Sequence, residues 1–195
     1  MKHTRRRKDT QGRTVREPQY FFGYKAQVSL NVEAELITSL SVIPGHRPDG
    51  QQLPTLVAKD LALGVPVRTV AADRGYDDSA NHVWLRAAGL HSALRLNTYR
   101  PRKKDRNKEV WLVLQASPEH RQGQAERYKV KRKSGEAKQG HGLRRCRYLG
   151  LLRYGIQSFL TAIAPNVKRL VKLLTGVNFK GHARLTSRPR EQCAW

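Results

Sequence analysis

The chain has 195 residues, enough for one domain of ordinary size with a buried core. Its 38 Lys and Arg against 15 Asp and Glu give a formal net charge of +23. This surplus predicts a nucleic acid as partner, because cationic side chains that neutralise phosphates release condensed counterions. A basic protein without such a partner and a ribosomal-type RNA-binding protein are the alternatives.

The cysteine content and the hydropathy of the chain exclude further classes of protein. Cys146 and Cys193 lie far apart, without a His or Cys at metal-ligand spacing, so neither a zinc site nor a disulfide framework is predicted. The basic start has no apolar stretch typical of a signal peptide, and no run of about 18 apolar residues indicates a transmembrane helix. We therefore expect a protein of the cytoplasm, associated with the nucleoid, and no membrane partner.

The first third of the chain predicts a hairpin followed by a helix. Residues 1–18 are polar and basic, and we expect them to be disordered or a loop. Aromatic and β-branched residues over 20–30 and 36–43, with a short polar link, predict an antiparallel hairpin. Loop-forming residues follow at 44–50, and the apolar spacing over 51–63 predicts a helix that stops at Gly64.

The middle third alternates strands with helices. We expect a strand over 67–73, a helix over 78–88 and a strand over 90–96. A basic loop over 97–109 follows, and the apolar residues 110–114 fit either a helix or a strand.

The last third is predicted to be helical. Ser117-Pro118-Glu119 has the cap, proline and acid of a helix N-terminus, and the helical pattern runs on to Lys138. A second helix is expected over 151–174, where apolar residues form a helical stripe. This stripe consists of Ile156, Leu160, Ile163, Val167, Leu170, Val171 and Leu174.

Asp73 is the candidate catalytic residue and metal ligand, because it ends an apolar strand and precedes Arg74-Gly75-Tyr76. A carboxylate at the carboxyl end of a sheet strand lies where α/β proteins commonly bind ligands. Carboxylates at such a place can hold the divalent ions that assist phosphoryl transfer. The structural alternative, which the residues alone favour equally, is a loop acid that caps the following helix.

Several segments together resemble the DDE transposases of bacterial insertion sequences. Ala72-Asp73-Arg74-Gly75-Tyr76-Asp77 is similar to the segment around the second catalytic Asp of that family. The same resemblance extends to further segments in the family's order: Phe22–Ala26, Pro44–Gly50, Gly135–Lys138, His141–Arg145 and Asn166–Leu170. It covers about residues 20 to 174.

The resemblance implies an α/β fold of the RNase H-like type, a mixed sheet with flanking helices. It also implies Mg²⁺ or Mn²⁺, DNA strand transfer at the terminal inverted repeats of an insertion sequence, and a possible homodimer in a full-length enzyme. The expected organisation is a basic disordered or loop segment at 1–19, a partial catalytic domain at 20–174 and a basic tail at 175–195. The hairpin and the Asp73 strand are expected in one sheet, with the C-terminal helices packed on it.

Two of the three acids that such an enzyme needs are not found. The family's helical signature aligns with Gln124, Arg127 and Lys138, and it places Lys131 at the position of the third acid. We expect the strand of the first acid, which is central in an RNase H-like sheet, to be missing because the chain is truncated upstream. Asp49 is a further candidate acid, although an Asp-Gly turn explains it better.

The predicted function is that of a transposase, as a truncated or degenerate copy; the alternative is a non-catalytic basic nucleic-acid-binding module. Positions 124, 127, 131 and 138 share one helix face, which is either a DNA-contacting stripe or a solvated basic face. The predicted DNA-binding residues are all cationic. They are Arg127, Lys131, Lys138, Arg144, Arg145, Arg147, Lys168 and Arg169.

Overall fold

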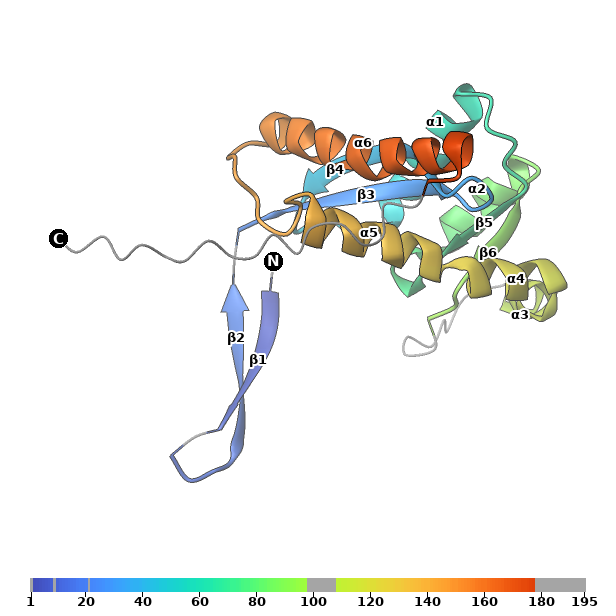
Figure 1. Cartoon of the computed structure of the whole chain (residues 1–195). Coiled ribbons are helices and arrows are strands. Elements are labelled where there is room, and N and C mark those ends of the chain that lie inside the picture. Colours follow the sequence, from blue (N-terminus) through green and yellow to red (C-terminus); the bar gives the residue numbers. More distant parts are fainter. Residues whose placement is uncertain (1, 9, 21, 98–107, 178–195) are drawn as a thin grey trace.

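The computed structural model describes residues 2–8, 10–20, 22–97 and 108–177, which form a mixed α/β structure (Figure 1). The described strands pair as three separate two-stranded sheets, β1–β2, β3–β4 and β5–β6. The prediction that the central hairpin and the Asp73 strand share one sheet is therefore wrong for these residues. Among the described strands, β3 pairs with β4 and β5 with β6, so no backbone hydrogen bonds join the two pairs into one sheet.

The N-terminal segment is a hairpin, where we expected disorder or a loop. Strands β1 (Lys2–Lys8) and β2 (Thr14–Tyr20) pair antiparallel in seven consecutive residue pairs. The hairpin projects away from the rest of the molecule (Figure 1), and Gly12 adopts a left-handed φ of 78° in its turn. Residues 7, 8 and 10–18 are all exposed, so in this part of the hairpin the strands are paired through the backbone without buried side chains.

The second hairpin and the helix after it agree with the prediction. Strands β3 (Tyr24–Asn31) and β4 (Leu36–Pro44) pair antiparallel, with an irregular register between Ser29 and Leu30. The short helix η1 (Gly50–Gln52) leads into α1 (Leu53–Ala62).

The strand–helix–strand unit around Asp73 also agrees. Strand β5 (Thr69–Ala72) is followed by the short helix η2 (Arg74–Tyr76), helix α2 (Ser79–Ala87) and strand β6 (His91–Leu94). The two strands run parallel. The Asp78 carboxylate caps α2 by accepting a hydrogen bond from the Ala80 amide.

The main apolar core lies between these elements. Its buried side chains come from α1, from α2 and from β6 with the turn before it. They are Leu53, Val57, Leu85, Leu90 and Leu94, with Val67, Val70, Ala72, Tyr76 and Trp84 packed against them. This core holds β5, and with it the position of Asp73.

Three helices follow residues 98–107, which lie outside the described chain together with most of the predicted basic loop. Helix α3 (Lys108–Ala116) shows that the segment 110–114 is helical. Helix α4 (Pro118–Glu126) begins at the predicted cap, where the Ser117 hydroxyl accepts from the His120 amide at 3.1 Å. Helix α5 (Tyr128–Gly140) continues after a break at Arg127, so the predicted single helix is two.

The long C-terminal helix α6 (Leu151–Thr175) lies along the β3–β4 hairpin (Figure 1). It packs through small and polar residues: Gly155, Ser158, Thr161 and Pro165 are buried, and the Tyr154 ring stacks on Tyr24. The predicted apolar stripe is therefore not the packing face. Six of its seven members are exposed: Ile156, Leu160, Ile163, Val167, Leu170 and Leu174.

None of the helices in the described part of the chain combines the length and the apolarity that a membrane crossing requires.

Two helical glycines offer a test of how closely α4 packs on the β5–β6 pair. A Cβ on Gly123 would lie 3.1 Å from the Ala93 Cβ and 3.2 Å from the Ala71 Cβ, whereas a Cβ on Gly135 of α5 meets nothing within 4 Å. Because neither alanine can rotate away, Gly123→Ala should lower the free energy of unfolding by about 1 kcal/mol despite the better helix propensity. Gly135→Ala should raise it by roughly 0.5–1 kcal/mol.

Urea unfolding followed by circular dichroism measures both changes. Equal stabilisation by the two substitutions would show that α4 does not press on the strands.

Candidate functional site

Asp73 lies at the carboxyl end of β5, where the chain turns into η2. Its Oδ1 accepts a hydrogen bond from the Gly75 amide at 3.0 Å, so the residue does cap the helix that follows. The side chain is nevertheless 57% exposed, and its Oδ2 faces Arg127 Nη2 at 3.9 Å. The capping role is thus confirmed, and the carboxylate still opens toward solvent beside a guanidinium.

Asp49 forms the second carboxylate of this region. Its Oδ1 accepts from Lys25 Nζ at 2.9 Å and from Gln27 Nε2 at 3.0 Å, both from β3. A Cβ on Gly75 would lie 3.2 Å from Asp73 Oδ1 and 3.6 Å from Asp49 Oδ2, so the two acids flank the bare glycine backbone. Asp49 is part of a turn, as predicted, but its side chain binds the hairpin rather than capping η1.

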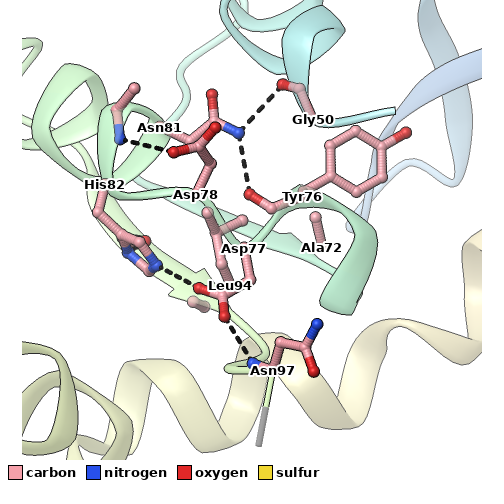
Figure 2. A network of polar contacts seen from close by, with 12 residues as sticks. Gly50, Ala72, Tyr76, Asp77, Asp78, Asn81, His82, Leu94 and Asn97 are labelled. Atoms are coloured by element: carbon pink, nitrogen blue, oxygen red, sulfur yellow. Dashed lines mark hydrogen bonds and ion pairs between the residues drawn. The ribbon is translucent and has the colours of Figure 1, made fainter. Parts of the chain in front are cut away.

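Asn81 of α2 holds the two acidic loops together. Its Nδ2 donates to the Gly50 carbonyl at 3.0 Å and to the Tyr76 carbonyl at 2.9 Å (Figure 2). Burial, and then the charges of Asp49 and Asp73, raise the pKa of the Tyr76 phenol well above its ordinary value. The phenol therefore stays neutral between the two carboxylates across the physiological range.

The donor set does not fit the pair of divalent ions that the resemblance implies. Two hard cations need several shared oxygen ligands, mostly carboxylates. Here the Asp49 carboxylate forms a salt bridge with Lys25, and the Asp73 carboxylate faces Arg127. Within the described ranges, no group of three or more His, Cys, Asp or Glu side chains could hold a metal ion.

A cationic cleft opens next to Asp73 instead. Its volume is about 540 Å³, and Gln124, Arg127 and Lys131 line it together, as their predicted common helix face requires. A third cation, Arg95, which no sequence pattern indicated, reaches the cleft from the chain after β6. The other lining residues are Gln115, His120, Ala125 and Tyr128, so none of the described carboxylates belongs to its wall.

Gln124 fixes the position of the central cation. Its Nε2 donates to the carbonyl of Ala72, the last residue of β5, and to the carbonyl of Ala93, the third residue of β6. Its Oε1 then accepts from Arg127 Nη1 at 2.9 Å. One amide thus links both strand ends to the guanidinium that faces Asp73, a role that the sequence did not reveal.

The two glutamates near position 131 do not enter the cleft. Glu126 pairs with Lys129 at 2.5 Å, and Glu136 lies 3.7 Å from Lys133. Lys138 is exposed toward the end of α5 and is not part of the cleft wall.

The predicted cations Arg144, Arg145 and Arg147 come together in the loop between α5 and α6. With Gly142 and Cys146 they line a second hollow of about 500 Å³, and all three are exposed. Gln157 of α6 shapes this loop: its Nε2 donates to the Gly142 and Arg145 carbonyls, and its Oε1 accepts from the Arg147 amide.

Lys168 and Arg169 have intramolecular partners. Lys168 Nζ lies 3.5 Å from Glu136 Oε1, while Arg169 Nε donates to the Ala34 carbonyl at 2.7 Å. Arg169 therefore ties α6 to the β3–β4 turn. Its contact with DNA, like that of the other predicted cations, stays a prediction.

A protein-family model matches most of the chain. The model of the transposase DDE domain matches residues 2–164. The chain belongs to this family. No curated protein and no solved structure matches it.

In this transposase-family chain, a buried polar network anchors the loop that follows Asp73. Asp77 Oδ1 lies 3.0 Å from His82 Nε2, and its Oδ2 accepts from the Asn97 amide (Figure 2). His82 Nδ1 lies 2.8 Å from Ser92 Oγ. The order Asp–His–Ser resembles a nucleophile triad, but His82 is 2% and Ser92 5% exposed, so the network joins α2, β6 and the loops rather than meeting a substrate.

Removing the middle of this network should destabilise the domain. In His82→Ala, Asp77 and Ser92 each lose a partner while remaining buried, so the free energy of unfolding should fall by roughly 1–3 kcal/mol. The matched control is His46→Ala, which removes an exposed imidazole and should change it by less than about 0.5 kcal/mol. Urea titration measures both variants; equal effects would contradict a supporting role for the network.

Proposed function

We propose that this chain is a degenerate transposase that keeps the DNA-binding function of its family but not, by itself, metal-dependent strand transfer. The ancestral reaction would be phosphoryl transfer at the terminal repeats of an insertion sequence, on an RNase H-like fold. The family match favours this origin over a basic nucleic-acid-binding module of unrelated ancestry. The retained activity is nevertheless that of such a module.

One observation carries the proposal: Lys131 lines the cleft beside Asp73 at the position where the family signature has its third acid. An ammonium there repels a divalent cation and attracts a phosphate. Arg95 and Arg127 add two more cations to the same wall. The cleft thus suits the ligand of the ancestral enzyme, DNA, while disfavouring its metal.

The expected contacts are to the phosphate backbone. Arg127, Lys131 and Lys138 would bind along the α4–α5 side, and Arg144, Arg145 and Arg147 from the loop before α6, with Lys168 and Arg169 as further contacts. Contacts of this kind need charge and reach but carry no sequence information. Binding should accordingly tolerate many DNA sequences.

The proposal predicts no metal-dependent DNA cleavage. Nicking of supercoiled DNA with Mg²⁺ or Mn²⁺ should not exceed that of an Asp73→Ala control, and Lys131→Glu alone should not restore it, because two ions need more than two carboxylates. Metal-dependent nicking by the unmodified chain that Asp73→Ala abolishes would show that the catalytic acids have been misplaced.

DNA binding itself should depend steeply on salt. Raising the salt concentration from 50 to 200 mM should weaken binding about a thousandfold if six or more phosphates are contacted. Replacing Arg127 and Lys131 together by alanine should lower the slope of log affinity against log salt by about 2, roughly 1 per lost contact. Arg86→Ala, an exposed cation of α2 outside both hollows, is the matched control.

Fluorescence anisotropy with duplexes of unrelated sequence measures these slopes. Affinity that is constant across this salt range would rule out the electrostatic mode, and an equal effect of Arg86→Ala would remove the cleft from the interface.

A further inference from the structure

The cleft beside Asp73 brings together three cations from separate segments of the chain. Arg95 follows β6, Arg127 lies between α4 and α5, and Lys131 belongs to α5, yet all three line the same hollow of about 540 Å³. This volume falls within the range of roughly 300–1,000 Å³ that is typical of small-ligand sites. The hollow therefore has the size that holds a whole small molecule.

Two of these cations have no counter-charge within the protein. In the part of the chain that the structure describes, no carboxylate forms a salt bridge with Arg95 or Lys131. By contrast, Arg132 of the same helix α5 pairs with Glu35 in the turn between β3 and β4. A concave surface lined by charge of one sign focuses the electric field and concentrates ions of the opposite sign. The cleft therefore favours an anionic ligand.

The number of cations distinguishes between two kinds of phosphate. Each phosphodiester of a nucleic-acid backbone carries one negative charge. A phosphate monoester carries about −1.5 to −2 at pH 7 and offers three acceptor oxygens. Three cationic side chains around one hollow match the charge and the oxygens of a monoester better than those of a diester. The cleft thus suits a terminal phosphate more than an internal one.

An aromatic side chain belongs to the same wall. Tyr128 lines the cleft and is 56% exposed, and the Arg132 guanidinium lies 5.8 Å from the centroid of its ring. Nucleotide bases stack on exposed aromatic side chains, and this contact tolerates any base because every base has a π-face. The cleft therefore combines cations for a terminal phosphate with a surface for a base.

We infer that the cleft is a binding site for a free nucleotide, a nucleoside 5′-monophosphate. Arg95, Arg127 and Lys131 hold its phosphate, and the Tyr128 ring stacks on its base. The same chemical group occurs at the 5′ end of a nucleic-acid strand, a source that the test below separates. The inference rests on the proposed function in one respect, that the cleft attracts phosphate rather than a divalent ion.

Isothermal titration calorimetry of the full chain, freed of nucleic acid and at low salt, tests this inference with adenosine 5′-monophosphate (AMP) as the probe. AMP should bind, and adenosine, which lacks the phosphate, should not. Lys131→Gln should weaken AMP binding at least about tenfold, because a charge-assisted hydrogen bond is lost. The matched control Arg86→Gln removes the same charge from an exposed position of α2 outside the cleft and should change the affinity less than about twofold.

Two further positions give results that a folding defect cannot produce. Asp73→Asn keeps an oxygen to cap η2 and removes the negative charge 3.9 Å from Arg127, so it should strengthen AMP binding roughly two- to fivefold. Tyr128→Ala should weaken AMP binding at least about fivefold, because the stacking contact is lost, but leave the binding of inorganic phosphate unchanged. Tyr128→Phe should retain the affinity for AMP.

Three results would overturn the inference. One is equal affinity for adenosine and AMP, and another is AMP binding that Lys131→Gln leaves unchanged. The third is that AMP does not bind, while a 5′-phosphate strengthens the binding of a single-stranded oligonucleotide and Lys131→Gln removes this gain. That third result would assign the cleft to strand ends instead of free nucleotides.

Duplex DNA without terminal phosphates, titrated against salt in parallel, tests the proposed function separately. If the duplex binds with a steep salt dependence and AMP does not bind, the inference fails alone. If AMP binds and the duplex does not, the proposed function fails and the nucleotide site stands.

Discussion

The side-chain amide of Gln124 connects the ends of β5 and β6 with the cation that faces Asp73. The Ala72 carbonyl at the end of β5 and the Ala93 carbonyl of β6 both accept hydrogen bonds from the amide nitrogen, while the amide oxygen holds Arg127. The amide can reach these carbonyls only because Gly123, the residue before it, lets α4 lie close to the strands. The charge of the cleft therefore depends on a helix–strand contact that involves no charged group.

The sequence predicted most elements but could not show which surface each would bury. For α6, periodicity located the helix correctly, but the apolar stripe that revealed it is not the face that packs. The helix instead packs through Gly155, Ser158 and Thr161, because small residues allow close approach to β4 and the Asn166 amide bonds to the backbone of Ile37. Amphipathicity alone does not distinguish a face that meets the core from one that meets another molecule.

The sequence correctly located those residues whose place in the fold a local pattern defines. Asp73 follows from the strand it ends, and the common face of Gln124, Arg127 and Lys131 follows from helical spacing. Arg95, Asn81 and His82 were missed, because their roles depend on pairs of segments that are brought together only by folding. The one-sheet prediction was wrong for a related reason: it required strand pairing between segments, which no local pattern specifies.

The same contacts that shape the cleft beside Asp73 also set which charge it attracts. Arg95, Arg127 and Lys131 line it, and the Gln124 amide holds the Arg127 guanidinium in place through a hydrogen bond of 2.9 Å. A guanidinium that is already positioned loses less side-chain freedom when it binds an anion than a freely rotating one does. A phosphate entering the cleft would therefore meet a cation that needs little rearrangement, whereas a divalent cation would meet like charge.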